Sequence, residues 1–137
     1  MFYPALIEKD NVGYAVSFRD IPEATTCADT VAQAEKMAAD ALLTAIDFYF
    51  ETGRAVPMPS SAAAGETLVP LPASVFAKIL LLNEMLAQGV SRSELARRMH
   101  TRPQDVQRIV DLGHATKIDT IEAALAKLGK RLILQAV

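Results

Sequence analysis

The sequence predicts an α+β protein of two domains: an N-terminal antiparallel sheet with one long helix, then an all-helical domain that ends in a short strand. Strand-like segments with alternating apolar residues fill most of residues 2–28. One apolar stripe at steps of three and four runs through residues 34–49, which indicates a long amphipathic helix. Beyond residue 72, short helical patterns with capping residues and terminal glycines follow one another to residue 129.

The first three strands are separated by residues that favour turns. Residues 2–8 are rich in aromatic and branched side chains, and residues 9–13 (Lys-Asp-Asn-Val-Gly) have the composition of a tight turn. Residues 14–18 alternate Tyr, Val and Phe with Ala and Ser, which predicts a strand with one buried face. Residues 23–28 are a weaker third strand.

A capping pair opens the long helix. Thr30 can accept an N–H of the first turn while Gln33 reaches back, and Gly53 is a reasonable stop. The Pro-, Ser- and Ala-rich loop that follows has neither helical nor strand periodicity. Residues 66–72 then look extended, and their two prolines restrict them to a sheet edge. We predict that they join the sheet as a fourth strand.

The predicted domains, residues 1–71 and 72–137, differ in charge. Residues 1–60 carry four Lys/Arg and nine Asp/Glu, a formal charge of −5, whereas residues 73–137 carry ten and six, a charge of +4. This asymmetry suggests two domains with different partners. The basic half suits a phosphate backbone, and the acidic half suits a basic protein.

Composition restricts the protein class. The chain is 137 residues long and 51% hydrophobic, which is enough apolar material for folded cores. The single Cys27 excludes an intrachain disulfide framework and fits a reducing compartment. We find no signal peptide and no apolar run near the roughly 20 residues that span a bilayer, so we expect a cytoplasmic protein without a membrane partner.

Residues 91–112 carry the densest positive charge and are predicted to form two short helices joined by a tight turn. Ser91 and Glu94 have the spacing of a capping box for the first helix. Thr101 and Gln104 can cap the second helix, which has a proline in its first turn. Five arginines stand against two acidic residues between the first serine and the last arginine of this stretch.

The second short helix offers a polar face that can read DNA. Its apolar residues fall at i, i+3 and i+4, which leaves Gln104, Gln107 and Arg108 on the outside. Gln suits adenine and Arg suits guanine, both by paired hydrogen bonds. We predict that these three residues read bases, and that Thr101 and Arg102 read bases or phosphates from the turn side.

Three further arginines are predicted phosphate contacts: Arg92, Arg97 and Arg98. Phosphate contacts position a protein on DNA without specifying sequence. In a dimer, two such second helices would enter successive major grooves about one helical turn apart.

The apolar, β-prone residues 131–137 form the predicted C-terminal strand. A lone strand after four helices has nothing local to pair with. We expect it to pair with its copy in a second chain, because unpaired strand edges are otherwise aggregation sites. An apolar tail packed on the helices is the alternative.

Other interpretations stay open. A solvated helical hairpin would also carry surface Arg and Gln. A stand-alone repressor with a ligand-sensing N-terminal domain predicts an apolar pocket there. A two-metal nuclease would need Asp20, Glu23, Asp40 and Asp47 as ligands, but solvated acids on an acidic domain explain all four. We therefore predict no enzyme, no catalytic residue, no metal and no cofactor.

Residues 73–129 resemble the repressor-type (Xre/Cro-like) helix-turn-helix domains of phage and plasmid regulators. The residues that carry the resemblance are Glu94, Leu95, Ala96, Arg97, Arg98, Met99, Val106, Ile109, Thr120, Ile121, Ala124, Leu128 and Gly129. His100 departs from the family, which usually has glycine at this turn position. The position often needs a left-handed backbone, which His tolerates better than most non-glycine residues.

The first domain resembles the HicB antitoxin family. The residues that carry this resemblance are Tyr3-Pro4, residues 13–18, residues 20–22, residues 29–34, residues 46–50, Pro57 and Pro59-Ser60. The resemblance implies a partial ribonuclease-H-like βββαβ fold that is not itself a nuclease. It also implies a partner, a small basic mRNA-cleaving toxin of the HicA type, without identifying the toxin-binding residues. The helix-turn-helix would bind operator DNA of the shared operon as a dimer or higher oligomer.

Overall fold

The computed structural model describes residues 1–137 and divides the chain into two compact units. The first unit contains Met1–Tyr49 and Pro57–Pro72, and the second contains Phe50–Val56 and Ala73–Val137. The sequence-based prediction placed residues 50–56 in the first domain, whereas in the structure they belong to the second compact unit. The functional domain limits, 1–71 and 72–137, stay a prediction. The side-chain amide of Asn83 bonds both the N–H and the carbonyl of Val56 at 2.8 Å, which fastens this segment to the second unit.

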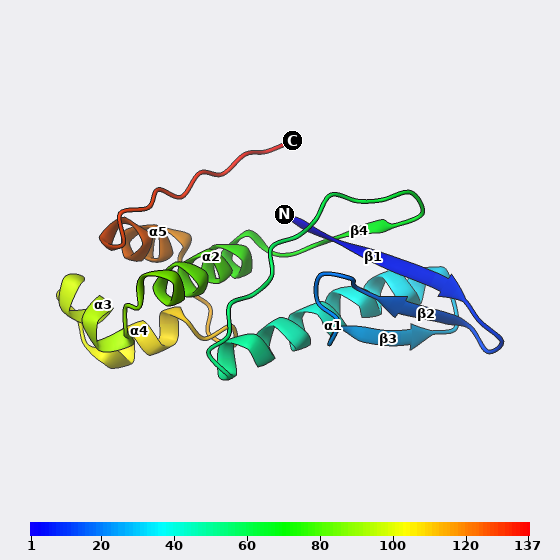
Figure 1. Ribbon diagram of the computed structural model, residues 1–137, viewed down its shortest axis with the longest axis horizontal. Coiled ribbons are helices and arrows are strands. Elements are labelled where there is room, and N and C mark those ends of the chain that lie inside the picture. The colour runs from blue at the N-terminus through cyan, green and yellow to red at the C-terminus, as the bar shows by residue number, and fades with distance from the viewer. The chain divides into compact units, whose positions relative to one another are not determined.

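The first unit contains a four-stranded antiparallel sheet (Figure 1). Its strands are β1 (Phe2–Lys9), β2 (Tyr14–Ser17), β3 (Thr25–Ala28) and β4 (Thr67–Pro70), in the order β3-β2-β1-β4. The second half of β1 pairs with β2 and the first half pairs with β4. The predicted antiparallel sheet, with a fourth strand after the long helix, is confirmed.

The turn between β1 and β2 follows from its sequence. The carboxylate of Asp10 accepts the N–H groups of Val12 and Gly13 at 2.9 and 2.8 Å. A Cβ atom at Gly13 would collide with the carbonyl oxygen of Ala28 on β3. Glycine is therefore required where the turn passes the edge strand.

Helix α1 (Val31–Glu51) follows β3 and lies along one face of the sheet (Figure 1). Thr30 accepts the N–H of Gln33 at 3.2 Å, as predicted for its cap. The Gln33 side chain accepts the N–H of Asp29, one residue before the expected partner, at 3.3 Å. The apolar stripe of α1 and one face of the sheet form the core of this unit. Fully buried members are Tyr3, Ala5, Ala34, Ala38, Leu42 and Ile46.

Polar contacts hold the loop before β4. Arg19 forms an ion pair with Glu66 at 2.9 Å and donates to the carbonyl of Ser61. The Tyr3 hydroxyl donates to the carbonyl of Pro57 at 2.7 Å. Burial, with smaller effects of the nearby Asp20 and Tyr49, raises the pKa of Tyr3 to about 12, so this donor stays protonated.

The second unit is built from four helices, as predicted: α2 (Ala73–Gln88), α3 (Arg92–Arg98), α4 (Pro103–Ile109) and α5 (Ile118–Lys127). Helix α2 packs on α5, and α3 packs on α4. One apolar core joins all four helices. Its members include Ala77, Leu81, Met85, Leu95, Val106, Ile109, Ile121, Ala124 and Leu125.

The single chain shows no C-terminal strand, and the predicted pairing of this segment with a second copy stays a prediction. Residues after α5 continue to Val137 without regular structure. A strand needs a neighbouring strand to satisfy its backbone groups, and the second unit holds only helices.

No single helix is long and apolar enough to cross a membrane. Helices α2 and α3 reach the required length and composition only when taken together, across a bend of 103°.

Candidate nucleic-acid interface

Helix α3 begins at a capping serine. The Ser91 hydroxyl accepts the N–H of Glu94 at 3.1 Å, which is one half of the predicted capping box. The other half is wrong, because the Glu94 carboxylate turns along the helix. It accepts hydrogen bonds from Arg97 at 2.6 and 2.9 Å and from Arg98 at 3.0 Å. Charged guanidinium groups are stronger donors than a backbone N–H, so the carboxylate bonds them in preference to the backbone.

The turn after α3 has the left-handed backbone that the sequence predicted. His100 has a φ of 55° and is the only non-glycine residue with positive φ. The N–H of Thr101 reaches back to the carbonyl of Ala96 at 2.9 Å, and the N–H of His100 reaches that of Arg97 at 3.2 Å. These bonds end α3 and reverse the chain within a few residues.

The cap of α4 differs from the prediction. Arg102, not Thr101, occupies the N-cap position, and Pro103 is the first helical residue. Asp105, rather than Gln104, reaches back: its carboxylate accepts the N–H of Arg102 at 3.2 Å and the hydroxyl of Thr101 at 2.5 Å. A carboxylate near a helix N-terminus is also favoured by the helix dipole, which a neutral Gln would not exploit.

Helix α4 has the two faces that the spacing predicted. Val106 and Ile109 are buried in the core of the second unit. Gln104, Gln107 and Arg108 are exposed. The buried residues fix the helix, and the exposed ones are available to an external partner.

The candidate residues contact one another through a hydrogen bond between α3 and α4 and through ion pairs with Asp105. Arg92 on α3 donates to the side-chain oxygen of Gln107 on α4 at 2.6 Å, although the sequence assigned them to different kinds of DNA contact. Arg102 and Arg108 lie on either side of Asp105, with N–O distances of 3.6 and 3.5 Å. The outer surface of α3 and α4 is therefore one continuous polar region rather than a set of separate side chains.

Arg97 and Arg98 are not equivalent. The Arg97 side chain is 73% exposed, whereas that of Arg98 is 34% exposed. Arg98 also donates to the carbonyl of Lys127 at the end of α5, at 3.4 Å, in addition to its bond with Glu94. Arg98 thus links two helices of the fold and is less available to an external phosphate than Arg97.

The two acids of this region remain ionised over a wide pH range. Hydrogen bonds from Arg97 and then Arg98 lower the pKa of Glu94 to about 2. The Thr101 hydroxyl, followed by the backbone N–H of Arg102, lowers the pKa of Asp105. Both carboxylates therefore offset part of the positive charge of the arginines at neutral pH.

One residue of this region was missed by the sequence analysis. Lys78 in α2 is buried, and its ammonium bonds the carbonyls of Arg108, Asp111 and His114. The sequence feature that could have pointed to Lys78 is its position as a lone lysine among the apolar residues of a predicted buried helix. Its partners lie more than 29 residues away, so spacing could not identify them.

The acids of the nuclease interpretation are not gathered into a metal site. No group of three or more His, Cys, Asp or Glu side chains is placed to hold a metal ion. Asp20 accepts the N–H and hydroxyl of Ser60 at 2.8 and 2.5 Å, and Glu23 accepts the hydroxyl of Tyr49 at 2.8 Å. Asp20 and Glu23 thus serve contacts within the first unit.

The ligand-sensing alternative predicts an apolar pocket in the first unit. A hollow of about 330 Å³ lies between the β1–β2 turn, the end of β3 and the start of α1. Its lining includes the polar residues Asp10, Asp29 and Gln33 beside Val12 and Met37. The hollow is thus of mixed polarity, and ligand sensing stays a prediction.

Comparison with known proteins places the chain in a family. Residues 2–80 match the family model described as HicB_like antitoxin of bacterial toxin-antitoxin system. The chain is 56% identical over 137 residues to Antitoxin HicB 2 of Photorhabdus laumondii, which covers 100% of the chain and 97% of that relative. It is 46% identical to Antitoxin HicB of Escherichia coli (strain K12), with both proteins covered fully. It is 38% identical to Antitoxin HicB of Pseudomonas fluorescens, covering 87% of the chain and 82% of the relative. The chain therefore belongs to the HicB-like antitoxin family of bacterial toxin–antitoxin systems.

Proposed function

We propose that this protein is an antitoxin that neutralises a small mRNA-cleaving toxin of the HicA type and represses its own operon by binding operator DNA. Family membership supports the antitoxin role, and it favours a regulatory rather than an enzymatic protein. In this proposal the first unit, a partial ribonuclease-H-like domain, binds the toxin, and the second unit, a repressor-type helix-turn-helix domain, binds DNA. The protein would act in the cytoplasm, where operator DNA is located.

The observation that carries DNA binding is the construction of α4. Its inner face is anchored by Val106 and Ile109, while Gln104, Gln107 and Arg108 face outward. These side chains have the chemistry to form paired hydrogen bonds with adenine and guanine in a major groove. The left-handed turn that joins α3 to α4 suits the helix-turn-helix arrangement, in which the second helix enters the groove.

Phosphate contacts are proposed for the arginines around this helix. Arg92 at the start of α3 and Arg97 at its end are exposed, and Arg102 precedes α4. Arg98 remains a phosphate candidate from the sequence, but its bonds to Glu94 and Lys127 make its contribution smaller. Thr101 donates its hydroxyl to Asp105, so any DNA contact would use its oxygen as acceptor.

The charges of the two units support separate partners. The first unit carries three Lys/Arg and nine Asp/Glu, a formal charge of −6, and the second carries a formal charge of +4. An acidic surface attracts a basic protein and repels nucleic acid. The second unit has the sign that DNA binding needs.

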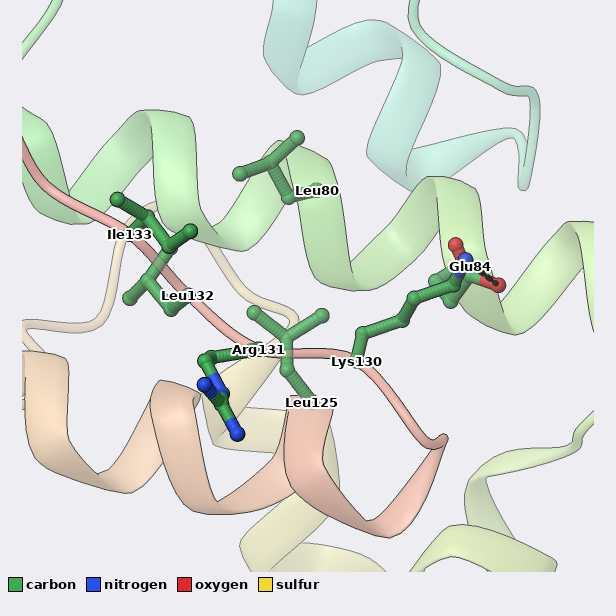
Figure 2. Close-up of a pocket in the computed structure, with 7 residues that line it drawn as sticks. All are labelled: Leu80, Glu84, Leu125, Lys130, Arg131, Leu132 and Ile133. Atoms are coloured by element: carbon green, nitrogen blue, oxygen red, sulfur yellow. Dashed lines mark ion pairs between the residues drawn. The ribbon is translucent and has the colours of Figure 1, made fainter.

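We propose that the protein acts as a dimer or higher oligomer through its C-terminal tail, residues 131–137. Ile133 is 80% and Leu134 61% exposed, although both are large and apolar. The tail lines a pocket of about 310 Å³ together with Leu80 of α2 and Leu125 of α5 (Figure 2). A second tail, pairing with the first as a strand, would satisfy its backbone groups and cover these apolar side chains.

The test of DNA binding is a fluorescence-anisotropy titration of the full chain against DNA from its own upstream region, at two salt concentrations, with scrambled DNA as control. We expect specific binding that weakens with salt, because released counterions drive phosphate contacts. Equal, weak binding to both DNAs would contradict operator recognition. Growth of cells that express the neighbouring toxin gene, with and without this chain, tests neutralisation.

Arg108→Ala is the sharpest variant for the proposed reading face. It should cost about 1–3 kcal/mol of operator binding and relax specificity, because it removes a paired base contact. Arg92→Ala is the comparison variant: it removes a proposed phosphate contact, so it should weaken binding to all sequences and flatten the salt dependence. Because Arg92 also bonds Gln107, any change of specificity in this variant reports the loss of that bond. Unchanged operator affinity of Arg108→Ala would show that another face of α4 meets the DNA.

A further inference from the structure

Lys78 is the only charged side chain buried in the chain. It lies in the middle of α2 and is 2% exposed. Its ammonium nitrogen is 2.5 Å from the carbonyl oxygen of His114, 2.6 Å from that of Asp111 and 3.4 Å from that of Arg108. The ammonium has three N–H donors, and three acceptors surround it. All three belong to the last turn of α4 or to the connector between α4 and α5.

Each of these carbonyls accepts one local hydrogen bond, and Lys78 supplies a second from another helix. The N–H of Asp111 bonds the carbonyl of Arg108 and the N–H of His114 bonds that of Asp111, both at 3.2 Å, and the Thr116 hydroxyl donates to that of His114 at 3.4 Å. The last carbonyls of a helix have no intrahelical partner and carry partial negative charge. Helix α4 has only seven residues, which is too short to hold its end by helix propensity alone. A buried cation at this end bonds the remaining lone pairs of these carbonyls and complements the helix dipole, and it links the last turn and the connector to α2.

Core packing does not require a lysine at this position. The apolar contacts of α2 with the rest of the second unit are made by residues such as Ala77, Leu81 and Met85. Burying an ammonium costs free energy unless it is fully hydrogen-bonded, and an apolar side chain would avoid that cost. Burial lowers the pKa of Lys78, while the carboxylate of Asp111 opposes the shift. The lysine is thus explained by what it bonds rather than by the space it fills.

We propose that Lys78 is a positioning residue for DNA recognition: it fixes the C-terminal turn of α4 and so determines where Arg108 is presented. This inference rests on the proposed operator binding. Lys78 bonds the backbone of Arg108 itself, and it is buried, so it acts without touching DNA. A shift of this turn would move the Arg108 guanidinium relative to the base edges, whereas the arginines of α3 would stay in place.

The experiment compares the full-length wild type with Lys78→Met and Lys78→Gln in two measurements. The first is hydrogen exchange by mass spectrometry. We expect faster exchange confined to peptides that cover residues 106–116, with peptides of α5 and of the first unit unchanged. Lys78→Gln, which keeps two N–H donors, should show a smaller effect than Lys78→Met. Faster exchange throughout the second unit would mean that Lys78 serves only overall stability, and would overturn the inference.

The second measurement is the ratio of affinities for operator and scrambled DNA at several salt concentrations. For Lys78→Met we expect this ratio to fall about tenfold, the scale of one misplaced base contact. The salt dependence should stay at the wild-type slope, because no phosphate contact is lost. Lys127→Met, which removes an exposed lysine from α5, is the matched control and should leave the 106–116 exchange unchanged.

The outcomes separate the two proposals. A wild type that does not distinguish operator from scrambled DNA contradicts operator recognition itself, whatever the variants do. A specific wild type with Lys78 variants of equal specificity overturns the positioning role alone. If Lys78→Met does not fold, Lys78→Gln decides by the same two measurements.

Discussion

At the residue scale, Glu94 controls how much positive charge α3 presents. Its carboxylate holds both Arg97 and Arg98, and its pKa of about 2 lies below the ordinary value of 4.5. A carboxyl with a lowered folded pKa stabilises the fold above its unfolded pKa, and this contribution is lost as the pH falls. Urea denaturation measures this contribution. As the pH falls from 4.5 to about 2, we expect the free energy of unfolding to decrease less in Glu94→Gln than in the wild type.

The same substitution gives a second readout on DNA. With the carboxylate neutralised, Arg97 is free to meet phosphates, so Glu94→Gln should bind scrambled DNA more tightly and with a steeper salt dependence. Glu122→Gln removes an exposed carboxylate from α5 and is the control for a change of one charge. A pH profile of Glu94→Gln identical to that of the wild type would show that the ion pairs do not persist in solution.

Residues whose partners are close in sequence were the predictable ones. The cap at Ser91 and the left-handed turn at His100 depend on neighbours within a few positions, and both are confirmed. Lys78 and the bond between Arg92 and Gln107 depend on helices that meet only after folding. Competition between donors for the same carboxylate also limited the prediction. Glu94 was expected to accept a backbone N–H at the start of α3, but the guanidinium groups of Arg97 and Arg98 donate to it instead.

At the element scale, the order of strands and helices was predictable because hydrophobic periodicity is a local property. The four strands, the long helix and the four short helices occur where the pattern placed them. The start of α4 was less predictable, because several residues near Pro103 can cap a helix and the geometry selects Asp105. The form of residues 131–137 depends on a partner, and periodicity cannot supply one.

The tail provides the prediction at this scale. Leu134→Glu places a charge at an exposed apolar position of the proposed dimer contact. We expect a lower molar mass at micromolar concentration in sedimentation experiments and weaker operator binding, because two linked recognition helices bind more tightly than one. The fold of the monomer should be unchanged, because Leu134 does not belong to the apolar core.

Gln135→Glu is the matched control for the tail, since it adds the same charge at a polar neighbour that lies on the opposite face of a strand. We expect it to weaken association less than Leu134→Glu. If Leu134→Glu kept the mass of the wild type, the tail would be a surface segment of one chain, and any oligomer would form elsewhere.

At the scale of the whole molecule, the division into two units of opposite charge has a functional consequence. The unit of charge −6 and the unit of charge +4 each have their own apolar residues and internal contacts. If the first unit meets the toxin and the second meets DNA, a surface change in one should leave the activity of the other intact. Distant, independent sites usually respond additively to substitution.

Arg102→Ala with Arg108→Ala tests this separation. Both side chains are exposed beside Asp105, so their removal changes the surface of α4 without opening the core. We expect the double variant to lose repression of a reporter fused to the upstream region, while cells that express the toxin still grow. Lys9→Ala with Lys36→Ala removes the same charge from exposed positions of the first unit and should keep repression.

Loss of both activities in the arginine variant would mean that toxin and DNA share one surface or one assembly. Retention of both activities would mean that neither Arg102 nor Arg108 contacts operator DNA, and would contradict the DNA contacts proposed for these two residues.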